Sequence, residues 1–339
     1  MNSPPAFIAG TGVSLPANIV TNEDLSERLG LDPEKIYRAS GIRERRWAAK
    51  GDSTGNLASA ALRAALKDAS LNPKDVDYLV LGTMTPDRMI PGTAPAVQQA
   101  LAMREIPCLD IRGACCNALY GLQVAQALIA SGIAHCVAVC LVDVQSPWLD
   151  LSARSGTISM LFGDGAATLM VMGEKRPNSL EILDILLATD GSYVDDLGIR
   201  RPGTEFGAAA GPLSEAEVFD YLPRMAGQSV ILQASRRMAA ACQNVLARNG
   251  KTIQEVRWIV PHQANANLLS QLARMLSLTS TEGVISVLEH MGNTSSASMG
   301  IALDTLRRLG APKTGDYVLL PAFAAGFTWG AGLCRVCEP

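Results

Sequence analysis

The 339-residue chain contains an internal repeat, and this repeat constrains the fold more than any other feature. A helix, a break and an apolar strand follow one another in LKDASLNPKDVDYLVLGT (66–83) and again in LARNGKTIQEVRWIVPHQ (246–263). Tyr78 of the first copy matches Trp258 of the second, which is an offset of 180 residues. Matching order and spacing over such a distance indicate a duplicated supersecondary unit.

Further along each copy lies a helix rich in small residues, in ACCNALYGL (114–122) and TSSASMGIAL (294–303). Gly121 and Gly300 align these helices at nearly the same offset. Two copies of an alternating strand–helix unit would each form a sheet covered by helices, packed together through these buried small-residue helices. We therefore expect an α/β fold of two pseudo-twofold halves, residues 1–172 and 173–339, with a loop-rich insertion at about 190–222.

Two local patterns give narrower predictions. SMLFGDGAATLMVM (159–172) reads as two strands joined by a hairpin turn at Gly163-Asp164-Gly165. GIRERRW (41–47) is the densest basic cluster, and it is either a solvated turn or a contact for a phosphate or an acidic partner.

The stretch CLDIRGACCNALYGLQVAQALIAS (108–131) predicts a strand, a tight turn and a buried helix. Cys115 and Cys116 fall at the first turn of that helix, where unpaired N–H groups and the helix dipole favour a thiolate. One of them could therefore be a nucleophile. The alternative is that both are small packing residues, because free cysteine is among the most buried residue types.

Composition excludes several classes of protein. The 29 basic and 32 acidic residues give a net charge of −3 with no long run of either sign, which argues against nucleic acid or an anionic membrane as partner. No apolar segment approaches the ~20 residues of a membrane span, and the first residues lack a signal-peptide pattern, so we expect a cytoplasmic protein. The eight cysteines should be free thiols; Cys334-x-x-Cys337 has redox or zinc-site spacing, but it lies in an apolar run with no second pair.

The duplication brings three reactive residues together. If the halves face each other, Asn293 in HMGNTSSAS and His262 in VPHQAN approach Cys115. Cysteine can carry an acyl group as a thioester. A neutral imidazole and an amide can donate hydrogen bonds to a thioester carbonyl as it becomes an enolate. The set therefore favours acyl transfer; a cysteine hydrolase would use similar residues, but no motif of that class surrounds Cys115.

These residues carry a resemblance to a known family. DIRGACCNALYGL, FGDGAA, VPHQAN, HMGNTSSAS and PAFAAGFTWG occur in the order and spacing of the ketoacyl synthase III family of the thiolase superfamily. The resemblance covers essentially the whole chain. It implies a thiolase-like fold with a layered α/β/α/β/α core, a Cys115 nucleophile with His262 and Asn293, and an oxyanion hole formed by the backbone N–H groups of Cys115 and Ala325.

The implied reaction is a decarboxylative Claisen condensation of a cysteine-bound acyl group with a malonyl thioester, giving a 3-oxoacyl thioester in fatty acid initiation or a related secondary pathway. No metal or redox cofactor is implied. The implied partners are an acyl-CoA or acyl-carrier-protein donor, a malonyl-acyl-carrier protein and a second copy of the chain. Seven residues match the family's substrate-binding positions. Ile90 matches a residue that would enter the partner subunit's pocket. The other six are Phe162, Met225, Gly227, Ile231, Asn265 and Phe323.

The sequence departs from the family pattern where CoA is usually held. Lys35 stands in place of a stacking tryptophan, and Ala39 and Asn267 in place of arginines. Asn117 and Leu119 also replace the usual residues after the nucleophile. The donor is therefore open between an acyl-CoA and a carrier protein. Two further functions also stay open: transfer of the acyl group to an oxygen or nitrogen nucleophile without condensation, and a non-catalytic dimer partner.

Overall fold

The computed structural model describes residues 4–152, 155–206 and 214–338. Nine strands are hydrogen-bonded in the order β11-β12-β13-β8-β1-β7-β6-β4-β5. The first half supplies β1 (Ala6–Ser14), β4 (Tyr78–Gly82), β5 (Cys108–Ile111), β6 (Cys136–Asp143) and β7 (Gly165–Met172). The second half supplies β8 (Leu180–Thr189), β11 (Val256–Ile259), β12 (Tyr317–Ala324) and β13 (Thr328–Val336).

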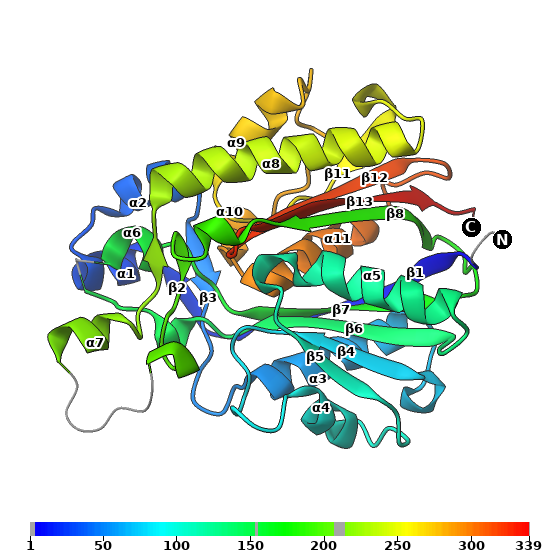
Figure 1. The fold of residues 1–339 in the computed structure, drawn as a ribbon, viewed down its shortest axis with the longest axis horizontal. Coiled ribbons are helices and arrows are strands. Elements are labelled where there is room, and N and C mark those ends of the chain that lie inside the picture. Colours follow the sequence, from blue (N-terminus) through cyan, green and yellow to red (C-terminus); the bar gives the residue numbers. More distant parts are fainter. Residues whose placement is uncertain (1–3, 153–154, 207–213, 339) are drawn as a thin grey trace.

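Helices separate and cover these two groups of strands (Figure 1). Between them lie α5 (Asn117–Ala130) and α11 (Ser298–Arg308). The outer face of the first half carries α3 (Thr54–Asp68) and α4 (Ala94–Ala100), and that of the second carries α8 (Gly227–Arg248) and α9 (Ala266–Met275). The predicted layered α/β/α/β/α architecture is therefore confirmed.

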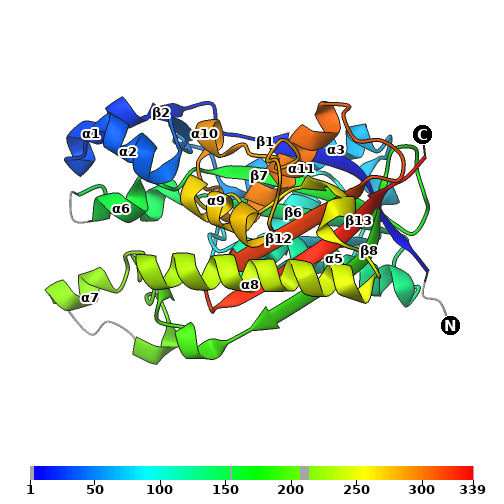
Figure 2. The same cartoon turned by 90° about the horizontal axis from the view of Figure 1, so that it is seen from above.

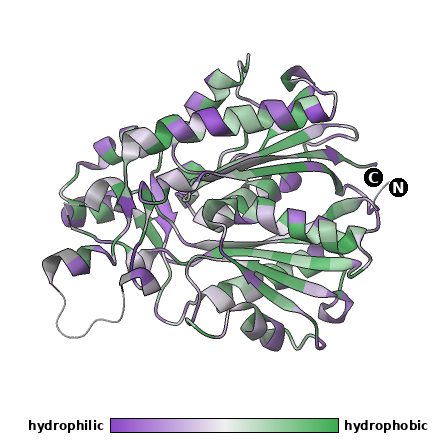
Figure 3. Cartoon of the chain, viewed as in Figure 1, coloured by the Kyte–Doolittle hydropathy of each residue, from purple (hydrophilic) through white to green (hydrophobic). Residues whose placement is uncertain are grey.

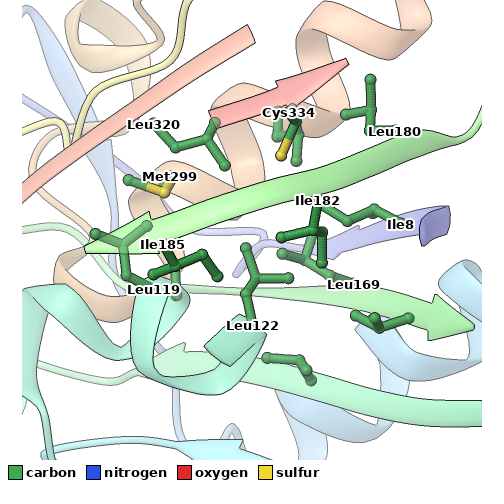
Figure 4. Close-up of a cluster of buried hydrophobic side chains, with 14 of the residues drawn as sticks. Ile8, Leu119, Leu122, Leu169, Leu180, Ile182, Ile185, Met299, Leu320 and Cys334 are labelled. Atoms are coloured by element: carbon green, nitrogen blue, oxygen red, sulfur yellow. The ribbon is translucent and has the colours of Figure 1, made fainter. Parts of the chain in front are cut away.

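The two groups of strands are not separate sheets. β1 pairs with β7 along most of its length and also with β8 over Ala6–Ile8, so one short ladder joins the halves. Leu119 and Leu122 of α5 pack with Ile182 and Ile185 of β8 in the central layer (Figure 4). Apolar residues dominate the strands and α5, whereas hydrophilic residues mark the outer helices and loops (Figure 3).

The shorter elements gather at the end of the molecule opposite the two termini (Figure 2). They include β2 (Ile19–Thr21), α1 (Asn22–Leu29), α2 (Pro33–Ser40), β3 (Glu44–Arg46), η3 (Ser146–Trp148), α6 (Gly156–Ser159), β9 (Leu197–Gly198), α7 (Glu215–Phe219), β10 (Arg224–Met225) and α10 (Leu288–Met291). Single 3₁₀ turns lie at η1 (Pro73–Asp75), η5 (Gly191–Tyr193), η6 (Thr204–Phe206) and η7 (Ile253–Glu255). Part of the predicted loop-rich insertion, residues 207–213, lies outside the described ranges.

The two central helices begin in the same way. Each follows a 3₁₀ turn, η2 (Ala114–Cys116) before α5 and η8 (Ser295–Ala297) before α11. Each turn opens on a non-glycine residue in the left-handed region, Ala114 with φ 48° and Ser295 with φ 47°. Ala114 therefore matches Ser295. The offset between these two residues is two larger than the offset between Gly121 and Gly300. Both glycines let a central helix pack closely on a strand, since a Cβ atom would meet Val139 of β6 at Gly121 and Ala167 of β7 at Gly300.

The predicted hairpin over 159–172 is wrong. Ser159 ends α6, and only Gly165–Met172 forms a strand, β7. Between them Asp164 is fully buried, and its carboxylate accepts hydrogen bonds from the N–H groups of Ala48, Gln145 and Ser146. This carboxylate organises a loop between distant segments, which a turn pattern alone cannot distinguish from a hairpin.

The basic cluster at 41–47 is mostly structural. Arg45 is fully buried, and its guanidinium donates to Asn22 Oδ1 at 2.8 Å and to the carbonyl of Met160 at 2.7 Å. Arg43 forms an ion pair with Glu289 at 2.7 Å. Both predicted alternatives, a solvated turn and a phosphate contact, are therefore wrong for Arg45, which joins β3 to the neighbouring loops.

Candidate active site

A cavity of about 470 Å³ lies where the two halves meet, a size typical of small-molecule sites. Cys115, His262 and Asn293 all line it. They come from the start of the first central helix, the end of β11 and the turn before the second central helix. The structure thus brings the three predicted reactive residues to one cavity.

The two neighbouring cysteines have different surroundings. Cys115 lines the cavity, and its Sγ lies 3.5 Å from Ser295 Oγ. Cys116 is fully buried, and its Sγ lies 3.6 Å from the carbonyl oxygen of Thr328. A substrate in the cavity can therefore reach Cys115, whereas Cys116 packs beneath it.

The environment of Cys115 favours the neutral thiol. Burial raises the pKa of Cys115 to about 12; the hydrogen bond with Ser295 lowers this pKa in part, and the charge of Asp143 raises it. The helix start favours the thiolate, as predicted from the sequence. Desolvation, which depends on the packing around Cys115, has the larger effect on its pKa.

His262 is held as a neutral imidazole. It is almost fully buried, and burial lowers its pKa to about 4. Its Nδ1 lies 2.7 Å from Ser298 Oγ, and that oxygen also accepts the N–H of Gln263 at 3.3 Å. Ser298 Oγ can donate its own hydrogen to Nδ1 while it accepts from Gln263, and in that arrangement the imidazole proton lies on Nε2.

Asn293 is oriented by its own loop. Its Oδ1 accepts the N–H of Ser295 at 2.9 Å, which leaves the side-chain NH₂ group as a donor. Its backbone is fixed on both sides, since Asn293 N–H donates to Leu161 and Gly163 N–H donates to the Asn293 carbonyl. Two neutral donors, an imidazole and an amide, thus line the cavity that contains the thiol.

A buried polar network joins the two helix starts beneath the cavity. Asn117 accepts the N–H of Gly113 at 2.6 Å and donates to Ser296 Oγ at 2.9 Å. Asp143 accepts the N–H groups of Ser296 at 2.9 Å and Met84 at 2.6 Å. Asn117 therefore connects the turn before α5 to the turn before α11, and this structural role accounts for an asparagine so close to the nucleophile.

Comparison with known proteins decides the family. A family model described as 3-oxoacyl-[acyl-carrier-protein (ACP)] synthase III matches residues 109–191, and the model of its C-terminal part matches residues 246–336. A beta-ketoacyl-[acyl-carrier-protein] synthase III of Chlamydia caviae is 35% identical over 333 residues, 98% of this chain and 97% of the relative. The chain belongs to the 3-oxoacyl-[acyl-carrier-protein] synthase III family.

Solved members of the synthase III family have the same fold. The enzyme from Aquifex aeolicus is 34% identical and superposes with a TM-score of 0.87, covering 98% of this chain and 99% of its own. The priming beta-ketosynthase from the R1128 polyketide biosynthetic pathway is 28% identical, with a TM-score of 0.86 and coverages of 98% and 96%. This chain is thus similar both to a 3-oxoacyl-[acyl-carrier-protein] synthase III and to a priming beta-ketosynthase of a polyketide biosynthetic pathway.

Only some of the substrate-binding residues that the synthase III resemblance implies line the cavity. Five of them line the cavity, and so does Ala325, whose backbone N–H donates to no other group in the part of the chain that is described. Gly227 begins α8 and Ile90 is 88% exposed, and neither lines the cavity of this chain. The five lining residues are Phe162, Met225, Ile231, Asn265 and Phe323.

Sequence reasoning missed residues that position the reactive groups. Ser298 and Ser295 lie within the HMGNTSSAS motif, but its run of hydroxyl residues gives no signal for which of them faces His262 or Cys115. The replaced CoA position Asn267 donates to the carbonyl of Ala39 at 3.1 Å, so it ties α9 to α2. Among the described residues there is no group of acidic, histidine or cysteine side chains that could hold a metal, and no helix could span a membrane.

Proposed function

We propose that this chain catalyses the decarboxylative condensation of a Cys115-bound acyl group with a malonyl thioester carried by an acyl-carrier protein. One observation carries the proposal: a reachable thiol and two neutral hydrogen-bond donors, from His262 and Asn293, line one cavity. The names of the relatives, beta-ketoacyl-[acyl-carrier-protein] synthase III, support the same reaction.

In the first step Cys115 Sγ forms a bond to the acyl carbon of the donor thioester. The bond from that carbon to the donor sulfur breaks, and the donor leaves as a thiol with the cysteine proton. The developing oxyanion would be held by the backbone N–H groups of Cys115 and Ala325. Because burial raises the pKa of the resting thiol to about 12, only a small fraction of Cys115 is thiolate at pH 7, and this fraction attacks the donor.

In the second step the malonyl thioester loses carbon dioxide. The electron pair of the broken carbon–carbon bond moves into the thioester, which becomes an enolate. His262 Nε2–H and the Asn293 amide donate to the enolate oxygen, and neutral donors suit this role because they do not protonate the carbanion. The enolate carbon then forms a bond to the acyl carbon, the bond from that carbon to Cys115 Sγ breaks, and the released thiolate takes up a proton from solvent.

Assembly as a homodimer belongs to the same proposal. Ile90 is exposed on a proline-rich loop next to Met89, which does line the cavity. A second copy would cover Ile90 and extend the wall of its neighbour's cavity. The alternative functions, transfer to an oxygen or nitrogen nucleophile and a non-catalytic partner, have less use for a fixed Asn293 donor.

Intact mass spectrometry tests the proposal. The protein is incubated with a panel of acyl-CoAs and acyl-carrier proteins, and malonyl-carrier protein is then added. We expect an acyl adduct on Cys115 that is released as a 3-oxoacyl thioester, and no adduct on Cys115→Ala. The proposal fails if no donor gives an adduct, if Cys115→Ala keeps it, or if the adduct moves to an alcohol or amine but not to malonyl-carrier protein.

A further inference from the structure

The cavity wall has an excess of positive charge. Four arginines line it, Arg88, Arg112, Arg201 and Arg224, against the single carboxylate of Asp87. Most of the remaining wall is apolar. Arg88 and Arg112 are exposed at this wall, so their charge is available to an anionic group that enters the cavity.

Two of these arginines are already neutralised. Arg224 forms an ion pair with Asp220 at 2.6 Å, and Arg201 lies 3.5 Å from Glu217 and 3.7 Å from Asp220. The guanidinium groups of Arg88 and Arg112 make no ion pair or hydrogen bond with any residue that the structure describes. Asp87 does not serve them, because its oxygens accept the Gly55 N–H and the Ser53 hydroxyl.

Of the four arginines that line the cavity, Arg112 is nearest to Cys115 in the sequence. It directly follows β5 and lies three positions before Cys115, which limits their Cα atoms to ~10 Å apart. The backbone of this segment is fixed, because the carbonyl of Ile111 accepts the Thr83 N–H at 3.2 Å and Gly113 N–H donates to Asn117 Oδ1 at 2.6 Å. Arg112 thus offers an unpaired guanidinium from a fixed backbone, in the cavity where an acyl group on Cys115 would lie.

The position of Arg112 argues against a role with the donor's phosphates. In the family resemblance the nucleotide is held at α2 and α9, which meet where Asn267 donates to Ala39. β5 is the last strand of the first half, whereas α9 covers the outer face of the second half (Figure 1). Arg112 therefore belongs to a different part of the site from the elements that would hold the nucleotide.

We propose that Arg112 binds the terminal carboxylate of a dicarboxylic acyl group held as a thioester on Cys115, with Arg88 adding to the positive field. This inference rests on the proposed function of Cys115. A guanidinium and a carboxylate can form two parallel hydrogen bonds, which would select an acyl chain with an anionic end over a neutral one. The acylation step is unchanged: a thioester forms on Sγ, and the donor leaves as a thiol with the cysteine proton.

Succinyl-CoA and butyryl-CoA test this inference, because they share a four-carbon acyl chain and the same nucleotide. The acylation rate of Cys115 is measured for each by intact mass spectrometry. We expect the wild-type protein to react with succinyl-CoA about tenfold faster, the size of one charged hydrogen-bonded contact. Arg112→Met, which keeps a long unbranched side chain, should remove or reverse this ratio.

Arg224→Met is the matched control. Arg224 lines the same cavity, but Asp220 already neutralises it, so its loss should change both rates by the same factor. An equal loss of both rates in Arg112→Met would mean a phosphate or structural role, and a wild-type preference for butyryl-CoA would mean a neutral acyl group; either overturns the inference. If neither thioester nor any other donor acylates Cys115, the proposed function itself has failed.

Discussion

Burial acts in opposite directions on the pKa values of the two titratable residues of the site. It raises the pKa of Cys115 to about 12 and lowers that of His262 to about 4, so both are neutral at pH 7. Below its pKa, the thiolate fraction of Cys115 rises tenfold for each pH unit. His262 stays uncharged at any pH above about 5.

This pair predicts different pH profiles for the two steps. The acylation rate should rise steadily from pH 6 to 9 without a plateau, because the thiolate becomes more abundant throughout that range. The reaction of pre-acylated enzyme with malonyl-carrier protein should be nearly flat over the same range, since His262 is already neutral. Rapid-quench mass spectrometry measures both rates; an acylation plateau near pH 7 would contradict the raised pKa of Cys115.

Asn293 should matter for one step only. We expect Asn293→Ala to keep the acylation rate within a few fold of wild type and to slow decarboxylation by ~10²–10³-fold, the usual effect of losing one oxyanion donor. Trapping the acyl-enzyme and measuring carbon dioxide release separates the steps. Equal loss of both rates would show that the residue positions the whole cavity instead of the enolate.

Ser298 should fix the proton of His262. Replacing Ser298 with alanine removes the hydroxyl that lies 2.7 Å from Nδ1, so the imidazole proton is no longer confined to Nε2. Nitrogen NMR of His262 should change from one tautomer to a mixture, and decarboxylation should slow about tenfold while acylation persists. An unchanged tautomer in Ser298→Ala would remove this role.

These residues show how far a sequence can define a site. Cys115, His262 and Asn293 were predictable because a duplication and five motifs fix their order. Ser298 was not, because its role depends on which side of a helix start faces β11. Nor could the pKa of Cys115 be predicted, since desolvation depends on packing that no local pattern records.

At the scale of elements, the turn that carries Asn293 depends on Gly163. A Cβ atom there would lie 2.3 Å from the carbonyl oxygen of Met291 and 3.2 Å from Arg45 Cβ. We expect Gly163→Ala to destabilise the protein by ~2–4 kcal/mol, because backbone must shift to admit the methyl group. Decarboxylation should fall more than acylation, since Gly163 N–H donates to the Asn293 carbonyl.

Gly191→Ala is the control for this change, because nothing beyond its two chain neighbours lies within 4 Å of the point that its Cβ would occupy, and its backbone is not left-handed. Chemical denaturation should place Gly191→Ala within ~0.5 kcal/mol of wild type, as is usual for exposed positions. If Gly163→Ala were equally neutral, the close approach of the two turns would not be needed. The sequence could not predict this contact. A Gly-Asp-Gly turn can join two hairpin strands, and it can equally pack against a distant loop, as it does here.

At the scale of the whole molecule, the repeat predicted the layers but not how they join. Alternating strands and helices of the two copies required a helical layer between two groups of strands. The short β1–β8 ladder that unites the strands could not be predicted, because either strand could equally end at a sheet edge. The same geometry leaves β5 as the last strand of the order, with one side unpaired among the described strands.

An unpaired edge beside exposed apolar side chains predicts a homodimer. Leu109 of β5 is 36% exposed, and Met89 and Ile90 on the neighbouring loop are 76% and 88% exposed. A second copy pairing through β5 would satisfy the edge and cover these side chains. Ile90→Glu would place a charge in that interface, so we expect sedimentation equilibrium to shift from dimer toward monomer and the acylation rate to fall.

Ile133→Glu gives the matched comparison for this dimer. Ile133 is 65% exposed, but it follows α5 at the far end of that helix from Cys115. The same charge there should leave both mass and acylation rate unchanged. A monomeric wild-type protein, or equal effects of the two substitutions, would contradict the dimer. A dimer that resists Ile90→Glu would instead mean that the β5 edges hold it without the loop.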